Sequence, residues 1–86
     1  MNAQRAHELL VATYGLDIVH WNCLLKGLQV LSKYYGNLDQ VTTIDTAEVF
    51  VSGFAACVEK MSEDDVKQLG MNGWTYAPSH DSWQFA

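Results

Sequence analysis

The sequence of 86 residues has few charged side chains, few basic ones and no long apolar run. Charged residues make up 17% of the chain, and only five of them are Lys or Arg. These five are dispersed along the chain, so the basic footprint of a nucleic-acid-binding domain is missing. No stretch approaches the roughly 18 consecutive apolar residues of a membrane-spanning helix. We therefore expect no direct contact with nucleic acid and no membrane.

Sequence signatures of catalysis and of cofactor binding are equally scarce. The chain has no glycine-rich phosphate loop. His80, Asp81 and Ser82 are the three residue types of a hydrolase triad. However, they are adjacent, whereas a triad needs side chains that converge from separate segments. We expect neither an enzyme nor a bound cofactor.

Only two cysteines are present, Cys23 and Cys57, and they are too far apart for a Cys-x-x-Cys motif. His20 and Cys23 lie three residues apart in a predicted helix, a spacing that suits two zinc ligands. Cys57 and His80 could complete a tetrahedral set, but nothing in the sequence brings them together. We expect two buried, reduced thiols, no metal and a cytoplasmic location.

What the chain does contain is enough for one folded domain. Hydrophobic residues make up 49% of it, which is a globular balance, and its length suffices for one domain spanning residues 1–86. Apolar residues recur at helical spacing over residues 3–14, 18–35 and 45–61, and a short fourth helix is expected over residues 63–69. Between the second and third helices, residues 41–44 are β-prone, and a short strand is possible there.

The last segment changes character, because large aromatic and polar residues alternate in it. Trp74-Thr75-Tyr76 and Trp83-Gln84-Phe85 flank a stretch of turn-forming residues, which predicts a β-hairpin. The expected fold class is therefore α+β: a small single domain of three main helices plus one short helix and a C-terminal β-hairpin. The helical part covers residues 3–70, and the hairpin covers residues 73–86.

The predicted helix over residues 45–61 has the cleanest amphipathic stripe and is expected to be the spine of the core. Phe50 and Phe54 lie one turn apart on its apolar face, so we expect both to be nearly fully buried. In the preceding helix, Gly27 costs about 1 kcal/mol relative to alanine, and we interpret it as the mark of a close crossing.

The densest acidic patch is the first candidate for partner binding. It consists of Glu59, Glu63, Asp64 and Asp65. These carboxylates could contact Lys or Arg of a partner, with Asp64 and Asp65 both exposed. Alternatively, they only stabilise the positive end of a helix dipole.

The aromatic hairpin is the second candidate for partner binding. Trp74, Tyr76 and Trp83, together with Phe85, could form a hot-spot surface, since Trp and Tyr dominate binding energetics. Alternatively, they close the core against the helices, because a hairpin alone is marginal in water. Both interpretations stay open at this point.

The net charge of −5 repels nucleic-acid backbones and favours a basic partner. We expect a non-enzymatic binding protein, namely an inhibitor that blocks a basic surface of its target, for example in a nucleic-acid-handling complex. By size and charge, the chain is comparable to phage or mobile-element anti-defence proteins, immunity proteins and antitoxins. One alternative is a homo-oligomer that buries Trp21, Tyr34 and Tyr35 and holds a small ligand between subunits. Another is an accessory subunit of a larger assembly.

Overall fold

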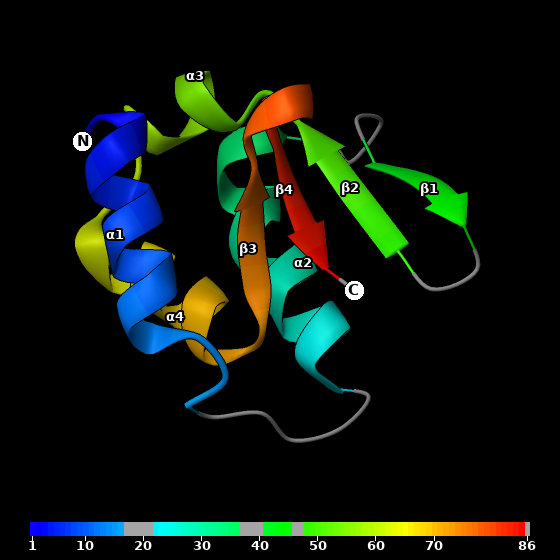
Figure 1. The fold of residues 1–86 in the computed structure, drawn as a ribbon, viewed down its shortest axis with the longest axis horizontal. Coiled ribbons are helices and arrows are strands. Elements are labelled where there is room, and N and C mark those ends of the chain that lie inside the picture. Colours follow the sequence, from blue (N-terminus) through cyan, green and yellow to red (C-terminus); the bar gives the residue numbers. More distant parts are fainter. Residues whose placement is uncertain (17–21, 37–40, 46–47, 86) are drawn as a thin grey trace.

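The protein is described by a computed structural model that places residues 1–16, 22–36, 41–45 and 48–85 (Figure 1). Its fold class is α+β, as predicted. In chain order, the elements are α1 (Ala3–Thr13), α2 (Asn22–Tyr35), β1 (Val41–Asp45), β2 (Glu48–Ser52), α3 (Phe54–Val58), α4 (Glu63–Met71), β3 (Trp74–Ala77), the 3₁₀ turn η1 (Pro78–His80) and β4 (Ser82–Phe85).

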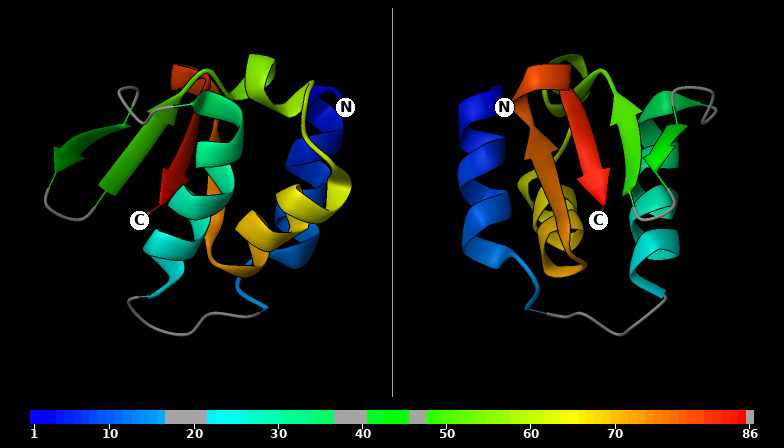
Figure 2. Two further views of the ribbon diagram at one scale, coloured as in Figure 1. Left: turned by 180° about the vertical axis from the view of Figure 1, so that it is seen from behind. Right: turned by 45° about the vertical axis from the view of Figure 1, so that its right-hand side comes forward.

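Four antiparallel strands form one sheet in the order β1-β2-β4-β3. The predicted C-terminal hairpin is confirmed by β3 and β4, in which Trp74 pairs with Phe85 and Tyr76 with Trp83. Paired residues, and residues two apart, share a face of a sheet, so these four aromatic side chains lie on one face. Seen from behind, α2 and α4 cover the sheet, while α1 runs beside β3 (Figure 2).

The core fills the space between this aromatic face and the helices. Trp74 and Trp83 are completely buried. Phe54, from α3, stacks on Tyr76 with 4.0 Å between ring centroids and lies against Trp83 at 4.5 Å. Aromatic pairs at such distances add about 0.5–1.5 kcal/mol each to the free energy gained by burying their area. The hairpin therefore closes the core.

The predicted helix over residues 45–61 is wrong. Strand β2 occupies its first part, and among the described residues of this range only the five of α3 are helical. Gly53 separates the two elements with a φ of 87°, a left-handed conformation that other residues resist. Val49, Phe50 and Val51 are β-branched or aromatic and favour an extended chain once β4 is beside them.

The error arose because β2 is covered on both faces. Val51 points toward the helices and is fully buried, and Phe50 points the other way, where the ring of His80 packs on it edge-on. A strand buried on both sides loses its alternating pattern, and its apolar run can imitate a helical one. The predicted burial of Phe50 and Phe54 is nevertheless confirmed, at 6% and 0% exposure.

The helix ends follow local signals. The Asn2 side chain accepts a hydrogen bond from the Arg5 N–H at 2.8 Å and caps α1. Gly15 and Gly36 follow the first two helices, and both have positive φ. The expected start of the second helix at residues 17–21 lies outside the described residues. No helix in the described part of the chain is long and apolar enough to cross a membrane.

Gly27 marks a close approach, but of a side chain to α2 rather than of another helix. The indole of Trp74 occupies the space that a Cβ at position 27 would need. In that position, the indole N–H donates a hydrogen bond to the carbonyl of Cys23, with an N–O distance of 3.2 Å. The hairpin is thus seated directly on the backbone of α2.

We predict that Gly27→Ala destabilises the protein by about 1–3 kcal/mol or more, because the new methyl group overlaps the Trp74 indole. Helix propensity alone predicts the opposite sign, a gain of about 1 kcal/mol. Urea unfolding followed by circular dichroism measures the change. Gln29→Ala, at an exposed position of the same helix, is the control and should leave stability nearly unchanged. A Gly27→Ala protein as stable as the wild type would contradict this packing.

Candidate functional site

The predicted acidic patch is partly used inside the protein. Glu63, the first residue of α4, forms an ion pair with Arg5 of α1, with Nε and Oε2 3.3 Å apart and both side chains about half exposed. Glu59 and Asp64 are exposed, and neither has an ion-pair partner among the described residues. The part of the patch that is exposed and has no ion-pair partner among the described residues therefore narrows to these two carboxylates.

The prediction that Asp65 is exposed is wrong, because only 18% of its side chain is accessible to solvent. It accepts a hydrogen bond from the hydroxyl of Tyr34 and pairs with the ammonium of Lys33 at 3.3 Å. The Tyr34 hydrogen bond, followed by the Lys33 contact, lowers the pKa of Asp65 despite its partial burial. The same hydrogen bond raises the pKa of Tyr34. Asp65 thus fastens the end of α2 to the start of α4.

We predict that Asp65→Asn lowers stability by about 1–2 kcal/mol at pH 7, because charge-assisted hydrogen bonds are lost. The folded-state pKa of Asp65 is lowered, so its contribution is fully present above the ordinary Asp pKa of about 3.9 and disappears as the pH falls through the folded value. Asp64→Asn, at the exposed neighbouring position, is the matched control. Urea unfolding at pH 7 and pH 3 measures both, and an equal response of the two variants would contradict the assignment.

The aromatic residues of the hairpin belong mainly to the core. Trp74 and Trp83 have no exposed surface, so a partner cannot reach them in this structure. Tyr76 and Phe85 are half-buried and pack against the same core. Of the four hairpin aromatic residues considered for partner binding, only Tyr76 and Phe85 have surface to offer.

Cys23 and Cys57 are both buried, and no disulfide joins them. Within the described residues, no group of three or more His, Cys, Asp or Glu side chains is placed to hold a metal ion. His20, the other half of the considered zinc pair, lies outside those residues. Burial raises the pKa of the Cys57 thiol, an effect that contacts with Tyr35 and Trp83 and the charge of Lys60 only partly offset. A raised pKa favours the protonated form of the Cys57 thiol at neutral pH.

We predict that both thiols of the native protein react slowly with a thiol reagent at pH 7.5, because reaction needs an accessible thiolate. After unfolding in guanidinium without reductant, two thiols per chain should react at once. Absorbance at 412 nm with Ellman's reagent counts them. A count of zero after unfolding would reveal a disulfide instead.

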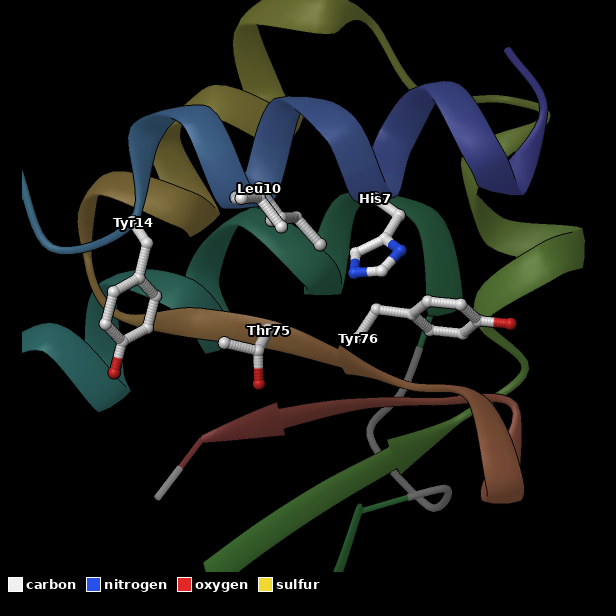
Figure 3. Close-up of a pocket in the computed structure, with 6 residues that line it drawn as sticks. His7, Leu10, Tyr14, Thr75 and Tyr76 are labelled. Carbon is white, nitrogen blue, oxygen red and sulfur yellow. The ribbon is translucent and has the colours of Figure 1, made fainter.

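A hollow of about 310 Å³ opens between the outer side of α1 and strand β3 (Figure 3). Leu10 and the His7 ring project from α1 toward β3, and His7 packs edge-on against Tyr76 at 5.4 Å. The Tyr14 side chain projects from the end of α1 and lies beside the strand. The lining residues are His7, Leu10, Val11, Tyr14, Thr75 and Tyr76. Most of these side chains are apolar or aromatic, which is typical of a surface that receives an apolar group.

Three of the four exposed large hydrophobic residues of the described chain lie close together in the sequence, and two of them, Val11 and Tyr14, line this hollow. Val11 is 67%, Tyr14 53% and Leu16 71% exposed, and all three lie in or directly after α1. Tyr14 continues the helical spacing of Ala6, Leu9 and Leu10 in the sequence, but unlike these three it is exposed. Apolar side chains gathered in one place commonly mark an interaction surface.

Sequence reasoning missed this surface, although a signal was present. His7, Val11 and Tyr14 follow each other at spacings of four and three residues, which places them on one face of a helix. Ala6, Leu9 and Leu10 follow a second stripe, and these three are buried. The helix is therefore apolar on two sides, whereas a helix at the surface of a domain usually has one apolar side.

A separate hollow of about 290 Å³, away from α1, lies between the end of α2, Gly53 and α3. Tyr35 donates a hydrogen bond from its hydroxyl to the carbonyl of Ser52 at 2.9 Å, and burial raises the pKa of that hydroxyl. Tyr34 is bound to Asp65. Both hydroxyls are thus engaged within the chain, and the hollow offers no ionised nucleophile. Trp21, the third residue of the considered oligomer surface, lies outside the described residues.

Comparison with known proteins supplies no family for this arrangement. No protein-family model matches the chain, and no curated protein or solved structure gives a significant match.

Proposed function

We propose that this chain is a non-enzymatic binding domain that uses the outer face of α1 to hold a protein with a basic surface. The observation that carries the proposal is the exposure of Val11 and Tyr14, which line the hollow between α1 and β3, and of Leu16, two residues after Tyr14. We name these three residues and the hollow the α1 surface. Tyrosine beside a hollow that takes an apolar side chain is a common centre of binding energy in protein interfaces.

The charge of the chain supports a basic partner over a second copy of the same chain. Each chain carries a net charge of −5, so self-association brings like charges together, whereas a basic protein is attracted. The ion pair between Arg5 and Glu63 holds the start of α4 beside the start of α1. The accessible carboxylates Glu59 and Asp64 therefore flank the end of α1 opposite to Tyr14, and they add steering to the apolar contact.

In this proposal, the chain acts by covering a surface. A small acidic domain that covers a basic surface blocks whatever else binds there, which suits an inhibitor of a nucleic-acid-handling protein. Two unoxidised cysteines fit a reducing compartment, and we place the activity in the cytoplasm.

We predict that Val11→Gln and Tyr14→Ala each weaken partner binding about tenfold or more, since each removes apolar contact area from the interface. The measurement is capture from a lysate of the native cells by immobilised wild type and variants, compared by quantitative mass spectrometry. Raising the salt concentration should reduce capture, because steering is screened beyond about 8–10 Å.

Leu25→Gln is the matched control for this experiment. Leu25 is 55% exposed but lies on α2, away from the α1 surface, so its replacement should change neither capture nor melting temperature. Val11→Gln and Tyr14→Ala should also melt like the wild type, because both side chains are exposed. An identical set of captured proteins for all four chains would refute the α1 surface as the binding site.

A further inference from the structure

We propose that the α1 surface binds an amphipathic helix whose polar face is basic. This inference rests on the proposed function and adds the shape and chemistry of the segment that is recognised. It derives from the ridges and grooves of α1, from the packing of Leu10 and His7 in the hollow beside it and from the charges next to both.

The outer face of α1 has ridges and grooves on which a second helix can pack. His7, Val11 and Tyr14 form a ridge along the helix at the i, i+4 and i+7 positions. A second hollow of about 310 Å³, lined by His7, Glu8, Val11 and Ala12, shares two residues with the first. His7 and Val11 thus lie between two hollows. A ridge between two grooves is the surface on which helices pack, with the partner's side chains in both grooves.

The length of α1 suits this mode of binding. Its 11 residues span about 16 Å, which is three turns. A partner helix crossing it could place apolar side chains at i, i+3 or i+4, and i+7 into the two hollows. This spacing of anchors is the usual one for a helix in an apolar groove.

Two residues that line the hollow beside β3 are held by packing within the protein. Leu10 is 1% exposed, and the His7 ring rests edge-on against Tyr76, with an angle of 71° between the ring planes. Packing limits the motion of these two side chains, so they lose less conformational freedom on binding, which favours affinity. An extended strand is a poorer occupant, because α1 lies alongside β3 and His7 packs against that strand (Figure 3).

The charges beside the ridge select a basic helix. Glu8 lines the second hollow. Arg5, one turn before it in α1, is paired with Glu63 and does not neutralise Glu8 in the described structure. A Lys or Arg next to the partner's apolar anchors would meet the Glu8 carboxylate. A second copy of α1 in the same place would bring another Glu8 instead.

A displayed library of randomised 16-residue peptides tests the inference. The library is selected on the wild type and in parallel on Val11→Gln, with Tyr14→Ala as a second variant of the ridge. Leu25→Gln is the control for exposed apolar surface elsewhere. Ala12 lines the second hollow but not the first, so Ala12→Tyr fills the second hollow alone. This variant should weaken the binding of a helix that needs both hollows and should not affect a ligand that needs only the first. Melting curves confirm that each variant folds.

The expected result is a set of peptides that depend on Val11, repeat apolar residues at helical spacing and are rich in Lys and Arg. Synthetic copies should become helical on binding, as seen by circular dichroism. Their Kd should rise at least about tenfold with Val11→Gln and with Ala12→Tyr, but not with Leu25→Gln.

Three other results would overturn the inference. The first is a set of peptides that need Val11 but are extended, acidic or insensitive to Ala12→Tyr. The α1 surface would then remain a binding site, but its occupant would not be a basic helix. If no selected peptide depends on Val11, both the inference and the proposed function fail. A wild-type dimer in sedimentation that Val11→Gln dissociates would show that a second copy covers this face, and it would also overturn both.

Discussion

The seating of the Trp74 indole on α2 is the contact on which the rest of the structure depends. The indole takes the space left by Gly27 and donates its N–H to the Cys23 carbonyl, so the aromatic face of the hairpin lies directly on helical backbone. The same hairpin places Trp83 against Phe54. A chain of this length buries only about 60% of its unfolded surface, and Trp74 and Trp83 of the hairpin are among its largest fully buried side chains. The aromatic hairpin is therefore first of all a structural element.

Placing the aromatic residues in the core leaves binding to another surface. Of the four candidate acids, Glu63 and Asp65 connect α4 to α1 and α2, and their charges contribute to folding as well as to the overall field. What the fold leaves uncovered is the second apolar side of α1, centred on Val11. Apolar contact there and a negative field around it act together, because the field brings a basic partner close and the apolar contact holds it.

Much of this protein could be read from local sequence. Helical spacing predicted α1, most of α2 and the existence of α4, whose cap is Ser62. Alternating aromatic residues around a turn predicted the hairpin, and apolar surroundings predicted that Cys23 and Cys57 are buried. These features depend on interactions within a few residues of each other, or on the simple need to remove apolar surface from water. The sign of the net charge is likewise a property of composition alone.

Only the tertiary structure decided the rest, because each remaining feature depends on a neighbour that is distant in the sequence. Phe50 lies in a strand rather than a helix because β4, more than 30 residues later, pairs with it. Asp65 connects α4 to α2 because Tyr34, which is distant in the sequence, lies beside it. Leu10 and Val11 are adjacent apolar residues of one helix, yet α4 and β3 cover Leu10 and leave Val11 at the surface. Apolar spacing tells which residues share a helix face, but which face meets water is fixed only when the other elements pack.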